Sequence, residues 1–230
     1  MTQPQPNKSD LPVRAASAFV MLLVAGAALW LGGWLWTAFV VAVAVGVLWE
    51  WWGLICAFVP SVAGRSAWML GGVFYVGLAA LVLAWLRLVP VMEAHTLLLA
   101  LLLAVIGTDV GAYFSGRAFG GPKIAPKISP SKTWSGLAGG VVGAAAALML
   151  VTYHAEGFDD FGWKLLAGAA IAVVAQSGDF FESWLKRRAG VKDSSHLIPG
   201  HGGLFDRADG LLAVLFAIGL LAAITFAARS

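Results

Sequence analysis

Long apolar runs take up most of this 230-residue chain, and they leave few folds open to it. A helix needs about 20 apolar residues to cross the hydrocarbon core of a bilayer. Seven runs have about that length, near residues 15–32, 34–58, 67–88, 94–118, 134–153, 163–187 and 208–228. The alternating short strands of a transmembrane barrel are missing from the sequence. We therefore predict an all-α, polytopic integral membrane protein with about seven transmembrane helices, with room for one or two more short or re-entrant segments.

Composition agrees with a membrane location. Charged residues make up 12% of the chain, against roughly 25% in soluble domains. The single cysteine, Cys56, allows no internal disulfide. Residues 1–13 are polar and contain three prolines, so we expect a disordered cytoplasmic tail there. The apolar run that follows has no persuasive cleavage site and is expected to be an uncleaved anchor.

Basic residues cluster in two of the predicted loops. The loop after the fourth run and its approach hold Arg117, Lys123, Lys127 and Lys132. The loop after the sixth run and its approach hold Lys186, Arg187, Arg188, Lys192 and Arg207. The loop after the fifth run is acidic instead, with Glu156, Asp159 and Asp160. By the positive-inside rule, both basic loops lie on the cytoplasmic side and can form one polar site there.

The sixth run ends in a row of polar residues with helical spacing. Asp179, Ser183 and Arg187 are four residues apart and share one helix face, with Lys186 beside them. A carboxylate inside a span is expensive and is by default functional. A purely structural pairing of Asp179 with Lys186 or with a neighbouring helix is the alternative.

Two further aspartates, Asp206 and Asp209, stand at the start of the seventh run. Either could cap a helix N-terminus. They follow the turn Gly200-His201-Gly202-Gly203, however, whose glycines allow a ligand to approach the backbone closely. Carboxylates from two segments beside phosphate-binding cations suit Mg²⁺, whereas the lack of sulfur and clustered histidine ligands argues against zinc. His201 could donate to a phosphate, orient a carboxylate or only shape the turn.

The other basic loop predicts an anion site. Asp109, Tyr113 and Arg117 share a helix face, and Ser129-Pro-Ser-Lys-Thr133 leads into the fifth run. A lysine, hydroxyls and backbone N–H groups at a helix N-terminus bind anions. The spacing of a Walker A loop is missing.

In these segments the chain resembles the phosphatidate cytidylyltransferases (CDP-diacylglycerol synthases). The family signature is matched by Ser183, Lys186-Arg187, Lys192-Asp193-Ser194, Pro199-Gly200-His201-Gly202-Gly203, Asp206-Arg207 and Asp209. Its upstream patterns are matched by Asp109 to Tyr113 and Ser129 to Trp134, so the resemblance covers roughly residues 109–210. Ser135 and Gly210 depart from the usual residues, an acidic or amide residue and a small hydroxyl residue respectively. Glu50 lies in an aromatic run, as in similar proteins.

The resemblance implies that CTP and phosphatidic acid react to give CDP-diacylglycerol and pyrophosphate. The implied catalytic residues are Asp179, Lys186, Arg187, Asp206 and Arg207. The implied substrate-binding residues are Asp109, Tyr113, Ser129, Lys132, Thr133, Ser183, Lys192, Asp193, His201, Gly202, Gly203 and Asp209. Asp179, Asp206 and Asp209 are the expected ligands of Mg²⁺, with room for an additional metal ion.

The same resemblance sets the expected organisation and partners. Residues 14–93 would form N-terminal transmembrane helices, and residues 94–230 a catalytic transmembrane core within one functional domain. The expected setting is a bacterial inner membrane, with partners CTP, phosphatidic acid and the bilayer, no nucleic acid, and a homodimer as in similar proteins. Three alternatives stay open. They are a CTP-dependent enzyme with a polyprenol or other lipid acceptor, an anion transporter, which would predict inverted repeats, and a CDP-alcohol phosphotransferase, whose clustered aspartates on one helix are missing.

Overall fold

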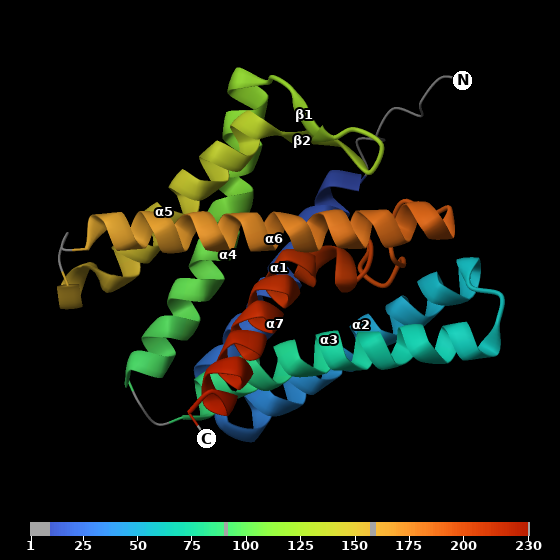
Figure 1. Cartoon of the computed structure of the whole chain (residues 1–230), viewed down its shortest axis with the longest axis horizontal. Helices are drawn as coiled ribbons and strands as arrows, with labels where there is room; N and C mark the ends of the chain where they lie inside the picture. The colour runs from blue at the N-terminus through green and yellow to red at the C-terminus, as the bar shows by residue number, and fades with distance from the viewer. Residues whose placement is uncertain (1–9, 90–91, 157–159, 230) are drawn as a thin grey trace.

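The computed structural model describes residues 10–89, 92–156 and 160–229, which form seven long helices and one small β-hairpin (Figure 1). The helices are α1 (Asp10–Leu31), α2 (Gly33–Phe58), α3 (Val62–Leu88), α4 (Met92–Phe119), α5 (Trp134–Glu156), α6 (Phe161–Ala189) and α7 (Phe205–Ala227). The hairpin strands are β1 (Lys123–Ala125) and β2 (Ser129–Thr133). All seven helices contain a segment long and apolar enough to cross a membrane. The predicted fold class, an all-α integral membrane protein, is confirmed.

The helix boundaries differ from the predicted ones most clearly at the starts of α1 and α3. Helix α1 begins at Asp10, so residues 10–13 of the predicted disordered tail are helical, while residues 1–9 lie outside the described residues. Helix α3 begins five residues earlier than predicted, because Ser61 caps it by accepting a hydrogen bond from the Gly64 N–H (3.1 Å). The predicted break between the first two helices falls at Gly32, whose φ of 65° suits glycine. Asp159 of the predicted acidic loop lies outside the described residues.

The hairpin between α4 and α5 was not predicted. Its strands are antiparallel, with Lys123 opposite Thr133 and Ala125 opposite Ser129. Pro126 in the turn and Pro130 in β2 lack the N–H that a helix needs, and their fixed φ suits extended chain and turns. The segment Ser129–Thr133 therefore approaches α5 as a strand.

Helices α4 and α5 touch backbone to backbone through glycines. A Cβ atom added at Gly111 would lie 2.2 Å from the carbonyl oxygen of Gly139, and one added at Gly143 would lie 2.1 Å from that of Gly107. Small residues in such positions let membrane helices pack closely. The hairpin therefore joins two helices that pack closely along their glycines.

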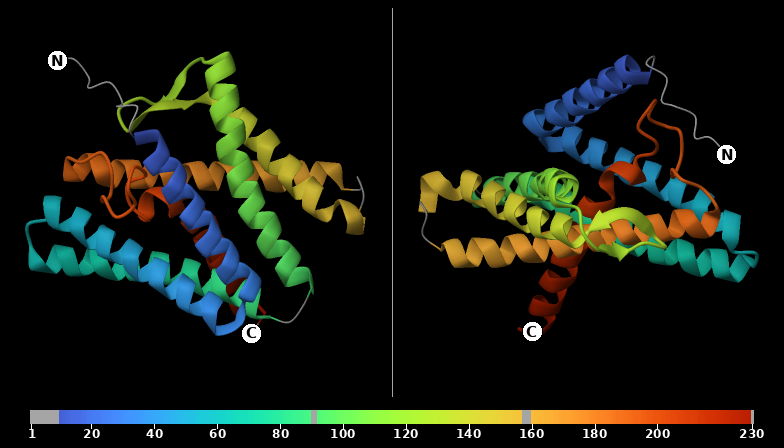
Figure 2. Two further views of the ribbon diagram at one scale, coloured as in Figure 1. Left: turned by 180° about the vertical axis from the view of Figure 1, so that it is seen from behind. Right: turned by 90° about the horizontal axis from the view of Figure 1, so that it is seen from above.

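An aromatic cluster and a close helix crossing hold the rest together. Trp51 of α2 packs against Phe181 of α6 and Phe205 of α7, with ring centroids 5.7 and 5.8 Å away. Gly178 of α6 lies so close to α7 that a Cβ atom there would be 2.5 Å from the Asp209 carbonyl oxygen. Figures 1 and 2 show α2 with α3 and α4 with α5 as two hairpins, and α6 packs against both. The crossing places Asp179 next to the start of α7.

Candidate active site

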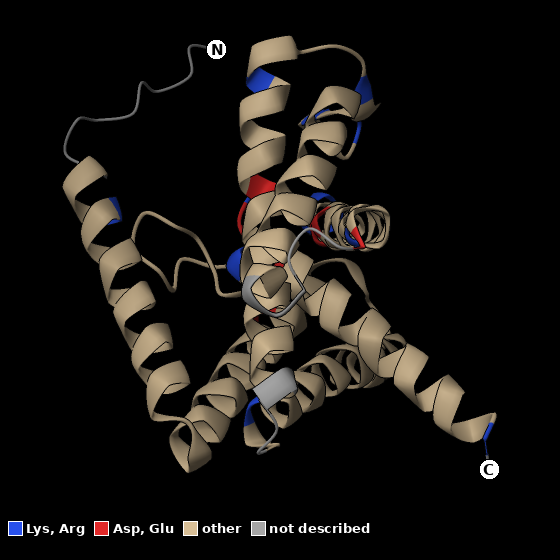
Figure 3. Cartoon of the chain, turned by 90° about the vertical axis from the view of Figure 1, so that its left-hand side faces the viewer, with Lys and Arg blue, Asp and Glu red and all other residues tan. Residues whose placement is uncertain are grey.

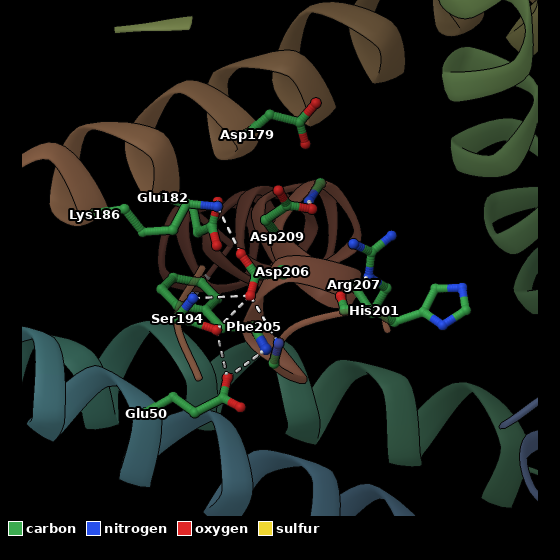
Figure 4. A network of polar contacts seen from close by, with 12 residues as sticks. Glu50, Asp179, Glu182, Lys186, Ser194, His201, Phe205, Asp206, Arg207 and Asp209 are labelled. Atoms are coloured by element: carbon green, nitrogen blue, oxygen red, sulfur yellow. Dashed lines mark hydrogen bonds and ion pairs between the residues drawn. The ribbon is translucent and has the colours of Figure 1, made fainter. Parts of the chain in front are cut away.

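Asp206 joins three parts of the polar site at the start of α7 (Figure 4). Its Oδ2 atom accepts hydrogen bonds from the Ser194 N–H (2.9 Å), the Ser194 hydroxyl (2.8 Å) and the Gly203 N–H (2.8 Å). Its Oδ1 atom lies 2.6 Å from Nζ of Lys186 on α6. One carboxylate therefore fixes the loop between α6 and α7 to both helices.

The glycines of the predicted turn are required by this arrangement. Gly202 has a φ of 84°, and a Cβ atom there would lie 2.8 Å from Oδ2 of Asp206. A Cβ atom at Gly203 would lie 2.1 Å from the Ser194 hydroxyl. The turn is closed by the Ile198 N–H, which donates to the Gly202 carbonyl (2.8 Å). From the sequence we expected these glycines to let a ligand approach the backbone closely. In the structure, the side chains of Asp206 and Ser194 lie in that position.

Glu182 is a member of this network that sequence analysis missed. It is 1% exposed, and its Oε2 atom lies 2.6 Å from Nζ of Lys186, which therefore bridges Glu182 and Asp206. Its Oε1 atom has no hydrogen-bond partner within the described part of the chain. The signal was available, because Glu182 precedes Lys186 by four residues, a helical ion-pair spacing.

Glu50 is the second missed member and comes from the N-terminal half. It is 2% exposed and accepts four hydrogen bonds. Oε1 accepts from the Ser195 hydroxyl (2.6 Å) and the Leu204 N–H (2.9 Å), and Oε2 accepts from the Ser194 hydroxyl (3.0 Å) and the Phe205 N–H (2.7 Å). Glu50 thus accepts from two of the backbone N–H groups at the start of α7, those of Leu204 and Phe205. From the sequence, Asp206 and Asp209 were the residues that could cap this helix N-terminus. A carboxylate in an apolar span was itself a functional signal.

The hairpin brings the second basic loop to the same site. Nζ of Lys132 in β2 forms an ion pair with Asp179 of α6. The hairpin thus contacts α6, and the ion-pair partner of Asp179 is Lys132, where Lys186 or a neighbouring helix was the structural alternative. Burial lowers the pKa of the Lys132 ammonium, and the nearby carboxylates Asp109, Asp209 and Glu182 oppose that shift.

A polar cleft of about 420 Å³ opens beside this ion pair. It is lined by residues of α4, the hairpin, α5 and α6: Asp109, Ala112, Tyr113, Gly116, Arg117, Lys123, Ser131, Lys132, Thr133, Gly136 and Gln176. The predicted helix face of Asp109, Tyr113 and Arg117 is therefore one of its walls. The Thr133 hydroxyl accepts a hydrogen bond from the Gly136 N–H (3.1 Å) and so caps α5. The buried Ser129 lies outside this lining.

The remaining predicted residues stand in different surroundings. His201 points away from the carboxylates, and its Nδ1 lies 2.9 Å from the hydroxyl of Ser17 on α1 (Figure 4). Arg207 donates from Nε to the His201 carbonyl (3.1 Å). Oδ1 of Asp209 accepts from the Gly210 N–H (2.8 Å). Ser183 is half-buried. Arg187, Lys192, Asp193 and Arg207 are exposed.

The carboxylates suit a hard cation by their chemistry. Asp179, Asp206, Asp209 and Glu182 offer only oxygen donors, as Mg²⁺ prefers, and Glu182 contributes the unpaired Oε1 atom. Lysines contact Asp179 and Asp206. Over residues 10–89, 92–156 and 160–229, no three His, Cys, Asp or Glu side chains are grouped closely enough to hold a metal ion. The donor types fit Mg²⁺, and its predicted ligands stay a prediction.

Comparison with known proteins places this site in a family. The model of the cytidylyltransferase family matches residues 61–225, which include the whole polar site except Glu50 and Ser17. The phosphatidate cytidylyltransferase of Brucella suis is 45% identical over 162 residues, 70% of this chain and 59% of that protein. The Pseudomonas aeruginosa protein of that name is 39% identical over 184 residues, 77% of this chain and 67% of that protein.

A third relative is similar over nearly its whole length. The phosphatidate cytidylyltransferase of Rickettsia felis is 33% identical over 226 residues, 94% of this chain and 95% of that protein. By contrast, the chain spans about 59% of the length of the Brucella relative that it matches. The extent of the family match and these identities agree with the sequence motifs, and the chain belongs to the cytidylyltransferase family.

Proposed function

We propose that this protein is a phosphatidate cytidylyltransferase, which transfers the cytidylyl group of CTP to phosphatidic acid and releases pyrophosphate. The observation that carries the proposal is the meeting of two basic segments over one carboxylate network. Lys132 of the hairpin reaches Asp179, and Lys186 reaches Asp206 and Glu182. The names of the relatives support the same reaction.

The reaction is an in-line displacement at phosphorus. An oxygen of the lipid phosphate forms a bond to the α-phosphorus of CTP, and the bond from that phosphorus to the bridging oxygen of the β-phosphate breaks. The electron pair leaves with pyrophosphate. The attacking phosphate is already ionised, so no side chain has to remove a proton. Positioning and charge neutralisation are therefore the work of the protein.

The lysines and arginines would neutralise the phosphates. Lys132, Lys123 and Arg117 line the polar cleft, whose volume of about 420 Å³ lies in the usual range for a ligand site. We assign the triphosphate of CTP to this cleft. Lys186 and Arg207 stand on the side of Asp206 and would contact the reacting phosphates. We assign Arg187 and Lys192 to the phosphate of the lipid, on the side from which the lipid would enter.

Asp179 and Asp206 would hold Mg²⁺, with Asp209 next to them as a further donor. Bound there, the ion would neutralise charge that develops on the phosphate oxygens. Lys132 and Lys186, which contact these two carboxylates, would then be free to turn toward the substrate phosphates. The proposed setting is a bacterial inner membrane with the site facing the cytoplasm, because both basic segments lie together. A homodimer is proposed from the family resemblance alone.

The test is acceptor choice by the purified protein with CTP and Mg²⁺. We expect phosphatidate to be converted to a cytidine-containing lipid, with no product when a chelator removes the metal. A polyprenol acceptor offered alone should give no product. Product from polyprenol but not from phosphatidate would replace the proposal with the alternative acceptor class.

A further inference from the structure

Gln176 of α6 carries a buried amide that has no role in the polar network. The residue is 4% exposed, and its Oε1 atom has no hydrogen-bond partner within the described part of the chain. Gln176 nevertheless belongs to the lining of the polar cleft. A buried polar atom without a partner is costly. A ligand in the cleft can supply the missing bond, because rotation about the last side-chain torsion turns the amide toward it.

Asp109 of α4 is a second polar group deep in the same cleft. It is exposed and lines the cleft, and Lys132 of the same lining pairs with Asp179 instead. Asp109 lies ten residues before the end of α4, and Gln176 lies thirteen residues before the end of α6. At 1.5 Å per residue these intervals are about 15 and 20 Å. Both groups therefore stand at the inner end of the cleft.

The outer end of the cleft is cationic. Arg117 lies two residues before the end of α4, and Lys123 lies in strand β1 of the hairpin. Figure 3 shows basic and acidic residues together around the helix pair that carries the hairpin. From Arg117 to Asp109 the α4 wall extends about 12 Å, a length that a nucleoside triphosphate can span. The cations suit the phosphates, and the inner end suits the uncharged, polar base.

Hydrogen-bond chemistry selects the base that fits these two groups. Cytosine has an exocyclic amino group, which donates, beside a ring nitrogen, which accepts. The Gln176 amide can bond both, and the Asp109 carboxylate can accept the second N–H of the amino group. Uracil has a carbonyl oxygen in place of the amino group. The amide can rotate to fit uracil, but an ionised carboxylate has no hydrogen to offer that oxygen.

We propose that Gln176 and Asp109 bind the cytosine base of CTP at the inner end of the polar cleft, and that Asp109 excludes uracil. The proposal rests on the proposed function and names the residues that select the nucleotide. The triphosphate would extend from there toward the cations at the outer end. Its α-phosphate would pass Lys132, which lies beside Asp179.

Two substitutions test the two roles by isothermal titration calorimetry, without phosphatidate so that no turnover occurs. Asp109→Asn gains an N–H that can face uracil, and we expect its preference for CTP over UTP to fall about tenfold or more. Gln176→Leu loses both bonds to the base, and we expect its Kd for CTP to rise about tenfold or more. Neither variant should bind inorganic tripolyphosphate more weakly than the wild type, because the cations at the outer end are unchanged.

Matched controls separate these effects from general damage. Asp160→Asn changes an exposed aspartate and Ser177→Leu changes an exposed serine next to Gln176, and neither residue belongs to the described lining of the cleft. Both controls should keep the wild-type Kd for CTP and for UTP. Gln176→Leu should keep or raise the wild-type Tm, since leucine removes a buried oxygen that lacks a partner. A lower Tm with equal losses of CTP and tripolyphosphate binding would mark a structural role and overturn the proposal.

Binding and activity together separate this proposal from the proposed function. If the variants change nucleotide binding as described but the wild type makes no CDP-diacylglycerol, only the proposed reaction fails. If the wild type is active and either variant keeps wild-type nucleotide binding, the assignment of the base is rejected and the reaction stands. Equal binding of CTP and UTP by the wild type would also overturn the assignment.

Discussion

Replacing Glu50 by glutamine tests whether the N-terminal half positions the catalytic network. The side chain keeps its size, but one carboxylate oxygen becomes an NH₂ group, which donates and cannot accept. If the NH₂ replaces Oε1, the Ser195 hydroxyl and the Leu204 N–H lose their acceptor. If it replaces Oε2, the Phe205 N–H loses its acceptor, while the Ser194 hydroxyl keeps Asp206 at 2.8 Å.

The second orientation costs less, so it determines how much stability the variant is expected to lose. It leaves one buried backbone N–H of α7 facing a donor, and a hydrogen bond to a charged group contributes about 1.5–3 kcal/mol. We therefore expect Glu50→Gln to lower the free energy of unfolding by about that amount. For a chain of this size the corresponding fall in Tm is about 3–12 °C. Because the same turn of α7 carries Asp206, kcat should fall as well.

Thermal unfolding and turnover of the protein in detergent measure both effects. Asp160→Asn is the matched control, since Asp160 is exposed and its side chain makes no capping hydrogen bond. It loses a carboxylate in the same way but should keep the wild-type Tm and kcat. A Glu50→Gln protein indistinguishable from Asp160→Asn in both measurements would refute the reasoning.

Three further substitutions probe other parts of the site. Gly202→Ala should lower kcat at least about tenfold, because its φ of 84° and a Cβ contact of 2.8 Å with Asp206 force the turn to move; steady-state kinetics would show it, and wild-type kcat would contradict it. Lys186→Met leaves two buried carboxylates without their shared cation and should destabilise the protein by about 3–5 kcal/mol, whereas an unchanged Tm would argue against the bridge. Gly111→Ala should destabilise it by about 1–3 kcal/mol through overpacking against Gly139, as followed by Tm, and a stable variant would mean that the two helices are not in such close contact.

Hydropathy alone located the helices because membrane thickness fixes their length. The break at Gly32 was predicted from two adjacent glycines, whereas the contact of Lys132 with Asp179 depends on the hairpin, which was not predicted. Ser61 and the proline pattern around the hairpin carried readable signals as well. The ends of the helices depend on such capping residues and prolines, and a count of apolar residues does not take them into account.

The polar network could be predicted only in part, because its partners come from distant segments. Asp206 was singled out by the turn before it, but its bond to Ser194 depends on the path of the loop. Glu50 is 155 residues from the Phe205 N–H that it accepts from, so no local pattern connects them. His201 was left open between three roles, and its contact with Ser17 of α1 follows from how α1 packs. Tertiary packing decides such pairings.

The central claim, transfer of a cytidylyl group to phosphatidate, is tested most directly by two labelled forms of CTP. Purified protein with phosphatidate and Mg²⁺ would receive CTP labelled at the α-phosphate in one reaction and at the γ-phosphate in another. We predict that the α-label enters the chloroform-soluble lipid and the γ-label leaves as pyrophosphate, and that Asp206→Asn abolishes both. Transfer of the γ-label to lipid, or no transfer of either label by well-folded wild-type protein, would contradict the account.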